Sequence, residues 1–231
     1  MKNNLPNVQG LGKVATSQNL YWPYGVWSDG EHLWIADTGN RRILFYETIP
    51  TANYQVADKV IGKKSFDEKD YDAEHAVWPY SIKVSDDGVL AITDTQYYRV
   101  LIWNHWKDAF IKTADAIIGQ PNLESCDQNQ YSLKPGANTL NWCYDAFLQN
   151  GSIWIADTGN SRILNFKNIP AENNQKSDKL YGNINFESID EHLEVGKVNS
   201  ERLYWPFAVT ATNEQLIITD TGNHWIVFYT I

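Results

Sequence analysis

The sequence predicts an all-β protein, a β-propeller built from four-stranded antiparallel blades. Three observations support this prediction: a repeat with a period near 60 residues, a high aromatic content, and no sustained helical periodicity. Aromatic residues make up 13% of the 231 residues and include 10 Trp, which suits stacked β-sheets. Only a short loop segment near Trp103–Lys112 suggests a helical turn.

The repeat consists of three short elements that return in a constant order. The central element reads "WIADTGNRRILFY", "AITDTQYYRVLIW", "WIADTGNSRILNF" and "IITDTGNHWIVFY", with Asp37, Asp94, Asp157 and Asp220 as its shared aspartate. These aspartates are spaced by 57, 63 and 63 residues. A tryptophan element precedes each copy, and an element of the "ADKVIG" kind follows the first three. A fixed order at a nearly fixed period indicates a repeat architecture.

Each unit reads as four short strands. In the first unit "YGVWS" leads to the turn at Asp29–Gly30, "HLWIAD" leads to the turn "TGN", and "RILFYE" and "KVIG" follow. Glycine and asparagine tolerate positive φ, so we expect them to take the left-handed positions of the "TGN" turn. Four antiparallel strands are the content of one propeller blade.

We expect a single domain over residues 1–231, with blades at about 20–62, 76–119, 140–182 and 203–231. The fourth unit shows three strands, and the segment "PNVQG" before the first unit weakly matches "DKVIG". The sequence therefore predicts that residues 6–10 complete the fourth blade, with Asn7–Gly10 paired to Trp225–Tyr229, and that a four-bladed ring closes without an open edge. The alternatives are a fragment or a partial ring completed by a second copy, so both a monomer and a homodimer stay open.

The same residues resemble a known family. "PYGV", the "DG" turn and "LWIADTGNRRILFY" are similar to the NHL repeat, a propeller module, and "VIG" and "IIGQPN" resemble its long-period bacterial form. Proteins with this repeat more often have six blades. Three units depart from the pattern, with Gln96 and Tyr97 in the second, Cys143 and Asp145 in the third, and Trp225 in the fourth. The resemblance implies a scaffold that binds a partner through one face.

We expect the binding residues at the channel mouth, where the tryptophan elements and the "DTGN" turns share one face of a propeller. The repeated aromatic candidates are Trp22, Trp78, Trp142, Trp205, Tyr24, Tyr80, Tyr144 and Phe207. The repeated cationic candidates are Arg42, Arg99 and Arg162. The irregular candidates are Cys143, Asp145, Tyr97, Tyr98 and Trp225.

Each repeated set also has a structural interpretation, because repeated residues usually serve the repeat. The aromatic set either forms a binding ring or packs blade against blade, and the sequence favours packing. The aspartates could hold a metal, but an aspartate before a tight turn accepts backbone N–H groups, and the arginines five residues beyond can pair with it. The structural role is favoured for these pairs. The irregular positions are the more informative candidates, with drift at a loop edge as their alternative.

Composition argues against several classes of protein. The formal net charge of −9 counts against nucleic-acid binding, which normally needs a cationic surface. No apolar run predicts a membrane span, and the residues before the first unit do not read as a signal peptide, so the cytoplasm is the expected location. Cys126 and Cys143 are too few for a disulfide framework or a zinc site and are expected as free thiols.

The sequence favours a binding protein over an enzyme. It contains no G-x-S-x-G, P-loop or H-E-x-x-H motif. We therefore expect a non-catalytic scaffold without a cofactor, whose partner is another protein or, alternatively, a small ligand. The resemblance also implies a second class, since related propellers include metal-dependent lyases and hydrolases with a site at the channel mouth. Their His and acidic clusters have no residue-by-residue match here, and RNA binding ranks last because of the charge.

Overall fold

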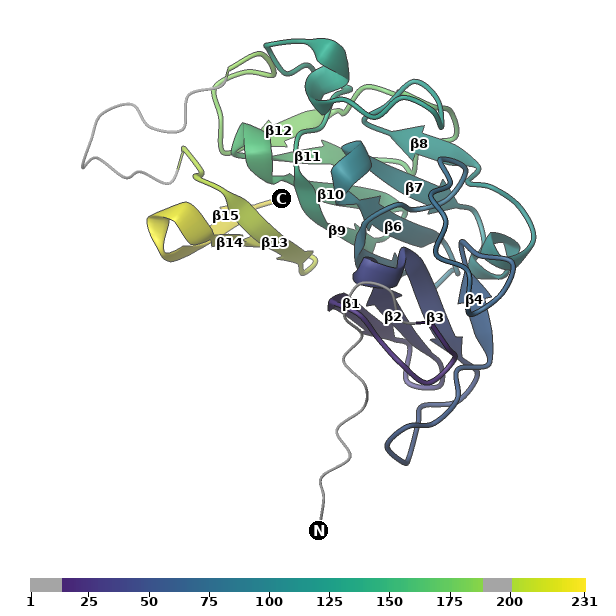
Figure 1. The fold of residues 1–231 in the computed structure, drawn as a ribbon. Helices are drawn as coiled ribbons and strands as arrows, with labels where there is room; N and C mark the ends of the chain where they lie inside the picture. Colours follow the sequence, from purple (N-terminus) through teal and green to yellow (C-terminus); the bar gives the residue numbers. More distant parts are fainter. Residues whose placement is uncertain (1–13, 189–200) are drawn as a thin grey trace.

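A computed structural model describes residues 14–188 and 201–231 as 15 strands joined by loops and short 3-10 turns. The strands form four antiparallel sheets, and the described residues contain no α-helix. The sheets follow one another around an arc, from the purple first sheet to the yellow fourth (Figure 1). The prediction of an all-β propeller with antiparallel blades is confirmed, and each sheet is one blade.

The blades are numbered in chain order. Blade 1 contains β1 (Pro23–Ser28), β2 (Leu33–Asp37), β3 (Arg42–Tyr46) and β4 (Lys59–Ile61). Blade 2 contains β5 (Pro79–Val84), β6 (Leu90–Asp94), β7 (Arg99–Trp103) and β8 (Ala116–Ile118). Blade 3 contains β9 (Cys143–Gln149), β10 (Ser152–Asp157), β11 (Arg162–Phe166) and β12 (Lys179–Tyr181). Blade 4 contains β13 (Pro206–Ala211), β14 (Gln215–Asp220) and β15 (Trp225–Thr230).

Short 3-10 turns join the second and third strands of every blade. They are η1 (Thr38–Asn40), η2 (Thr95–Tyr97), η5 (Thr158–Asn160) and η6 (Thr221–Asn223). The segment expected to contain a helical turn holds η3 (Trp106–Phe110), and η4 (Gln128–Tyr131) lies in the connection that leads to β9.

The first strand of each blade lies at the inner side of the arc. β1 contacts β5, β5 contacts β9, and β9 contacts β13. Figure 1 shows β1, β9 and β13 along the inner side of the arc. The strand order within each sheet is sequential, so the later strands lie farther from the axis. Because consecutive strands are antiparallel, the turn between the second and third strands and the connection into the first strand lie at the same end of a blade.

Apolar clusters between neighbouring blades form the core. In the first cluster Trp34 and Phe45 of blade 1 pack with Ile82 and Leu101 of blade 2. Two further clusters lie between blades 2 and 3 and between blades 3 and 4. Residues of a strand alternate between its two faces, so one strand serves two successive clusters. The blade-to-blade contact is therefore the repeated unit of packing.

The "TGN" turns differ from the expectation in one respect. The left-handed residue is the one after the asparagine, and Arg41, Tyr98, Ser161 and His224 have φ of 57°, 49°, 53° and 60°. The glycine is needed for space instead, because a Cβ on Gly39 would lie 2.5 Å from the carbonyl oxygen of Tyr21. The turn approaches the tryptophan element too closely for a side chain at that position.

Blade 4 has three strands among the described residues, and β15 pairs there with β14 alone. The fourth strand predicted at Asn7–Gly10 lies outside the described residues. In the described part of the chain no strand joins the sheet of blade 4 to that of blade 1, and many residues of β1 and β15 are exposed.

Candidate functional site

The tryptophan elements and the turns between second and third strands lie together at one end of each blade. The backbone N–H groups of Gly39, Gly159 and Gly222 donate to the carbonyls of Tyr21, Asn141 and Tyr204, each at 2.8 Å. In blade 2 the N–H of Thr95 donates to the carbonyl of Trp78 at 3.2 Å. The chain thus forms one loop face that carries the tryptophan elements of all four blades.

The shared aspartate and arginine form a buried pair inside each of the first three blades. In blade 3 the Nε of Arg162 donates to Oδ2 of Asp157 at 2.7 Å, and both side chains are fully buried. Oδ1 of Asp157 accepts the backbone N–H of Asn141 at 2.7 Å, and Oδ2 also accepts Nδ2 of Asn160 at 2.8 Å. Burial raises the pKa of the Asp157 carboxyl, and the charge of Arg162 opposes that rise.

The arginine of each pair also holds loop segments. In blade 3, Nη1 of Arg162 donates to the carbonyl of Phe186 at 2.6 Å, and Nη2 donates to the carbonyls of Gly136 and Thr139 at 2.8 and 3.0 Å. Arg42 and Arg99 make the equivalent bonds in blades 1 and 2. These three side chains lie inside the blades and bond to the chain itself, so we leave the arginines out of the binding surface.

The four tryptophans lie where the chain enters the first strand of each blade. Trp22, Trp142 and Trp205 are about half exposed, and Trp78 is partly buried. The first three also have a left-handed backbone, with φ of 48°, 46° and 51°. That conformation is uncommon for a bulky residue. Backbone strain of this kind often marks a functional position, which makes these indoles worth testing.

The aromatic residues two positions after the tryptophans contact one another across the inner strands, two pairs stacked and the Tyr80–Tyr144 pair edge to face. Ring centroids lie 4.1 Å apart for Tyr24 and Tyr80, 4.6 Å for Tyr80 and Tyr144, and 4.6 Å for Tyr144 and Phe207. Burial, together with the neighbouring hydroxyls of Tyr24 and Tyr144, raises the pKa of Tyr80 to about 12. These rings pack blade against blade.

A hollow of about 360 Å³ opens between blades 3 and 4 on the loop face. Its lining residues are Asn141, Trp142, Tyr144, Thr158, Gly159, Trp205 and Phe207. Four of the seven are aromatic candidates that the sequence singled out. The Nδ2 of Asn141 donates to the carbonyl of Gly159 at 3.2 Å, while its Oδ1 is buried and has no hydrogen-bond partner among the described residues. Aromatic rings and an unused acceptor therefore meet at one place.

Departures from the repeat leave this hollow open. Blade 2 carries Tyr98 after its turn, and the Tyr98 ring meets Trp142 edge to face with centroids 5.4 Å apart. Blade 3 carries the small Ser161 at the same position, and its Oγ accepts the backbone N–H of Trp205 at 3.3 Å. Ser161 therefore places no ring beside Trp205, whereas Tyr98 places one beside Trp142.

The two irregular residues of blade 3 lie inside the protein. Cys143 is fully buried, burial raises the pKa of its thiol well above the usual value, and the thiol faces the carbonyl of Arg99 at 3.5 Å. Asp145 accepts the hydroxyl of Ser81 at 2.6 Å and the backbone N–H of Val209 at 3.2 Å. It also lies 3.6 Å from Nζ of Lys83, an ionic partner within the chain. Asp145 therefore joins blades 2, 3 and 4.

The other irregular residues occupy different surroundings. Tyr97 is buried, with its ring 4.4 Å from the guanidinium of Arg99, so it supports the arginine of blade 2. Trp225 is about half exposed on β15, where it pairs with Asp220 across the sheet. The sequence placed both on the loop face, but only Trp225 offers an exposed ring.

The sequence missed the polar members of the hollow, Asn141 and Thr158. A signal was present for Asn141, which stands where the other units have Tyr21, Val77 and Tyr204. The free cysteines were foreseen correctly, since Cys126 and Cys143 form no disulfide.

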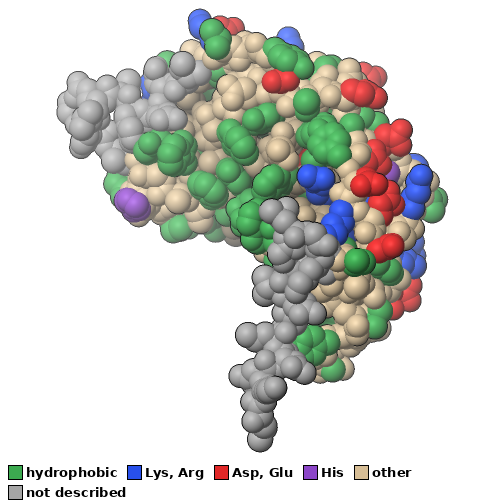
Figure 2. All heavy atoms as spheres, in the orientation of Figure 1, with side chains coloured by type: hydrophobic (Ala, Val, Ile, Leu, Met, Phe, Trp, Pro, Cys, Tyr) green, Lys and Arg blue, Asp and Glu red, His purple; other side chains and the backbone are tan. Residues whose placement is uncertain are grey.

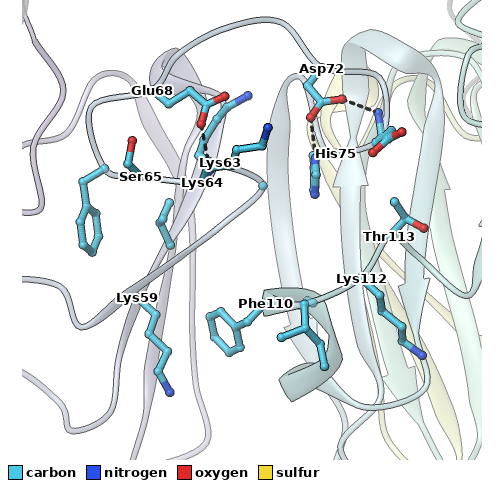
Figure 3. Close-up of a pocket in the computed structure, with 16 residues that line it drawn as sticks. Lys59, Lys63, Lys64, Ser65, Glu68, Asp72, His75, Phe110, Lys112 and Thr113 are labelled. Atoms are coloured by element: carbon cyan, nitrogen blue, oxygen red, sulfur yellow. Dashed lines mark hydrogen bonds and ion pairs between the residues drawn. The ribbon is translucent and has the colours of Figure 1, made fainter.

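A larger hollow, of about 830 Å³, lies at the outer edge between blades 1 and 2 (Figure 3). Its charged side chains have partners within the chain: Asp72 accepts Nδ1 of His75 at 2.8 Å, and Nζ of Lys63 donates to the carbonyl of Asp70 at 2.5 Å. Nζ of Lys112 lies 2.7 Å from a carboxylate oxygen of Asp115. This rim groove is larger than the loop-face hollow, but several of its charged side chains already have partners within the chain, so we favour the aromatic hollow.

Apolar and charged side chains occupy different parts of the surface. Figure 2 shows hydrophobic side chains gathered along the inner side of the arc over β9 and β13, with charged side chains toward the outer part of the molecule. In residues 14–188 and 201–231, no three His, Cys, Asp or Glu side chains lie in an arrangement that could hold a metal ion. Across these same segments, none of the helical turns has the length and apolar character of a membrane span.

Comparison with solved structures finds propellers. The virginiamycin B lyase of Staphylococcus aureus is similar with a TM-score of 0.48 and 16% identity, over 94% of this chain and 58% of the lyase chain. Myxococcus xanthus glutaminyl cyclase is similar with a TM-score of 0.47 and 13% identity, over 92% of this chain and 75% of that chain. A chain of an apo PRC2 complex in an autoinhibited state matches with a TM-score of 0.52 and 10% identity, over 90% and 38% of the two chains.

The class of protein, a β-propeller, follows from the four antiparallel sheets, and the match to the PRC2 chain, at a TM-score of 0.52, supports this fold and nothing finer. The chain spans a little over half of the length of the lyase. No family model matches the sequence, and no curated protein matches it either.

Proposed function

We propose that this protein is a binding scaffold that captures a segment of another protein in the hollow between blades 3 and 4. The observation that carries the proposal is the pair of half-exposed indoles, Trp142 and Trp205, beside a hollow of about 360 Å³. Exposed tryptophans around a concave site are the usual anchors of protein interfaces, because they bury a large apolar area at a low entropic cost.

The chemistry of the lining indicates what the segment would carry. The rings of Tyr144 and Phe207 suit an apolar or aromatic side chain. The Oδ1 of Asn141 is buried beside this lining, so it would accept an N–H group of the segment once the Asn141 side chain turns toward the hollow. The stacked inner strands and the buried Asp157–Arg162 pair hold this lining on a rigid frame, which limits the entropic cost of binding.

A displayed library of random peptides is the first test of this proposal. We expect enriched peptides to carry an aromatic or large apolar residue and to change the tryptophan fluorescence on binding. Trp142→Ala and Trp205→Ala should each weaken binding by about 30-fold, the effect of losing a hot-spot residue worth about 2 kcal/mol. Ile111→Ala is the matched control, because Ile111 is an exposed apolar residue in the connection after β7, at the opposite end of its blade.

Two results would contradict the proposal. One is that no peptide is enriched, or that enriched peptides bind both tryptophan variants as well as the parent protein. The other is stoichiometric metal in the purified protein together with a ligand that binds through it, which would favour the alternative of a metal-dependent lyase or hydrolase.

A further inference from the structure

The two ends of the arc expose the two halves of the contact that joins the blades. Each blade has a leading face toward the preceding blade and a trailing face toward the following blade. The trailing face of blade 1 includes Ile43 and Phe45, and the leading face of blade 2 includes Ile82. All three side chains are about 1% exposed, because the two faces cover each other.

The trailing face of blade 4 has the same chemistry, and within residues 14–188 and 201–231 no blade covers it. Ile226 and Phe228 lie six and eight residues after Asp220, as Ile43 and Phe45 lie after Asp37. Phe228 pairs across the sheet with Ile217, as Phe45 pairs with Trp34. Yet Phe228 is 57% exposed, against 1% for Phe45. Hydrophobic side chains of this size on one sheet face are typical of an interface.

The leading face of blade 1 is uncovered in the same way. Val26 is four residues after Trp22, as Ile82 is four residues after Trp78, but Val26 is 64% exposed and Ile82 1%. Beside it on this face lies a hollow of about 750 Å³. The apolar side chains of that hollow include Leu20, Leu33, Ile35 and Tyr46.

A hydrogen bond that links each blade to the next is repeated along the arc, and its donor and acceptor positions are exposed at the two ends of the arc. The hydroxyls of Thr38, Thr95 and Thr158 donate to the carbonyls of Pro79, Cys143 and Pro206 in the following blade. These threonines are buried. Their counterpart in blade 4, Thr221, is exposed, and so is Pro23, the counterpart of the acceptors. The row of aromatic contacts likewise runs from Tyr24 to Phe207 and ends at both residues.

We propose that two copies of this chain close a ring head to tail, with the trailing face of blade 4 in each copy packed on the leading face of blade 1 in the other. A second copy fits because it offers a leading face to the exposed trailing face and a trailing face to the exposed leading face. These two faces are complementary, since they correspond to the two halves of the contact that joins neighbouring blades within the chain. Two such contacts related by a twofold axis close the assembly, leaving neither face open. Thr221 of one copy would then meet Pro23 of the other, and Phe228 would enter the apolar leading face.

Mass measurement by light scattering after gel filtration tests the proposal. The parent chain should have twice its monomer mass of 26.5 kDa. Phe228→Lys and Val26→Glu should each give monomers with an unchanged circular dichroism spectrum, because both side chains are exposed within one copy. Ile111→Lys, a charge placed on an exposed apolar residue outside both faces, should leave the dimer intact.

Mixing the two monomeric variants tests the head-to-tail order. In a mixed pair one contact brings the introduced lysine against the introduced glutamate, and the other joins the original Phe228 and Val26, so a dimer should return. A contact between two equal faces would not be restored by mixing.

A parent chain that is monomeric at all concentrations overturns the proposal and favours a ring closed by its own residues 7–10. Three other results overturn the proposal as well: a closed assembly larger than a dimer, a Phe228→Lys variant that keeps the mass of the parent assembly, or no dimer after the two variants are mixed.

Discussion

Replacing Asp157 by alanine removes the carboxylate that organises the third blade. The fully buried Asp157 receives the Nε of Arg162 at 2.7 Å, the backbone N–H of Asn141 at 2.7 Å and the amide of Asn160 at 2.8 Å. Without it the Arg162 guanidinium stays buried with no ionic partner, and one backbone N–H loses its acceptor. We therefore expect a loss of stability, with weaker binding at the hollow only to the extent that the Asn141 backbone loosens.

The size of this loss follows from the burial of the pair. Breaking a buried ion pair by removing one partner costs about 3–5 kcal/mol. That is a large share of the roughly 5–15 kcal/mol that stabilises a typical domain. For a chain of this length each kcal/mol lowers Tm by about 2–4 °C, so Tm should fall by roughly 6–20 °C.

Urea unfolding followed by tryptophan fluorescence measures this effect. Asp178→Ala is the control, because Asp178 is an exposed carboxylate whose Oδ2 accepts one backbone N–H, from Lys167 at 2.9 Å. It should cost no more than about 1 kcal/mol. Adding Arg162→Met to Asp157→Ala should recover part of the loss, because the unpaired charge is then gone. A loss in Asp157→Ala no larger than that of the control would refute the reasoning.

Three further predictions concern thiols, packing and pH. Cys143 should not react with a thiol reagent at pH 8 until the protein unfolds, because burial keeps the pKa of its thiol raised. The partly exposed Cys126 should react in the folded protein. Equal reaction rates of the two thiols would contradict this. Gly39→Ala should cost about 1–3 kcal/mol in urea unfolding, since its Cβ would lie 2.5 Å from the Tyr21 carbonyl oxygen, and an unchanged midpoint would contradict the close approach. In the folded protein the pKa of Tyr80 is raised from 10.0 to about 12. The stability that the neutral Tyr80 hydroxyl contributes is therefore present below pH 10 and is lost as the pH rises toward 12. A Tyr80→Phe variant should lose less stability over that interval.

The repeat separates residues that build the blade from residues that differ between blades. The aspartate, the arginine and the turn glycine serve the frame, because each is buried or too closely packed for another role. Of the irregular residues, Cys143, Asp145 and Tyr97 also serve the interior. The position that opens a surface site is Ser161, which replaces a ring with a hydroxyl.

The sequence by itself determined the blades of this protein. A strand must alternate its side chains and a tight turn must contain particular residues, so strand positions, turn positions and the Asp157–Arg162 pairing could all be read from local patterns. The free thiols followed from the number of cysteines.

Only the tertiary structure decided which repeated residues are exposed. Trp142 and Trp78 occupy the same position in the repeat, yet Trp142 is about half exposed and Trp78 is partly buried. The left-handed position after the asparagine and the need for Gly39 likewise depend on how closely the tryptophan element approaches the turn. The exposed faces at Val26 and Phe228 depend on the arrangement of all four blades. The repeat pattern indicates which residues face a neighbouring blade, but it does not indicate whether the first and the last blade have such a neighbour.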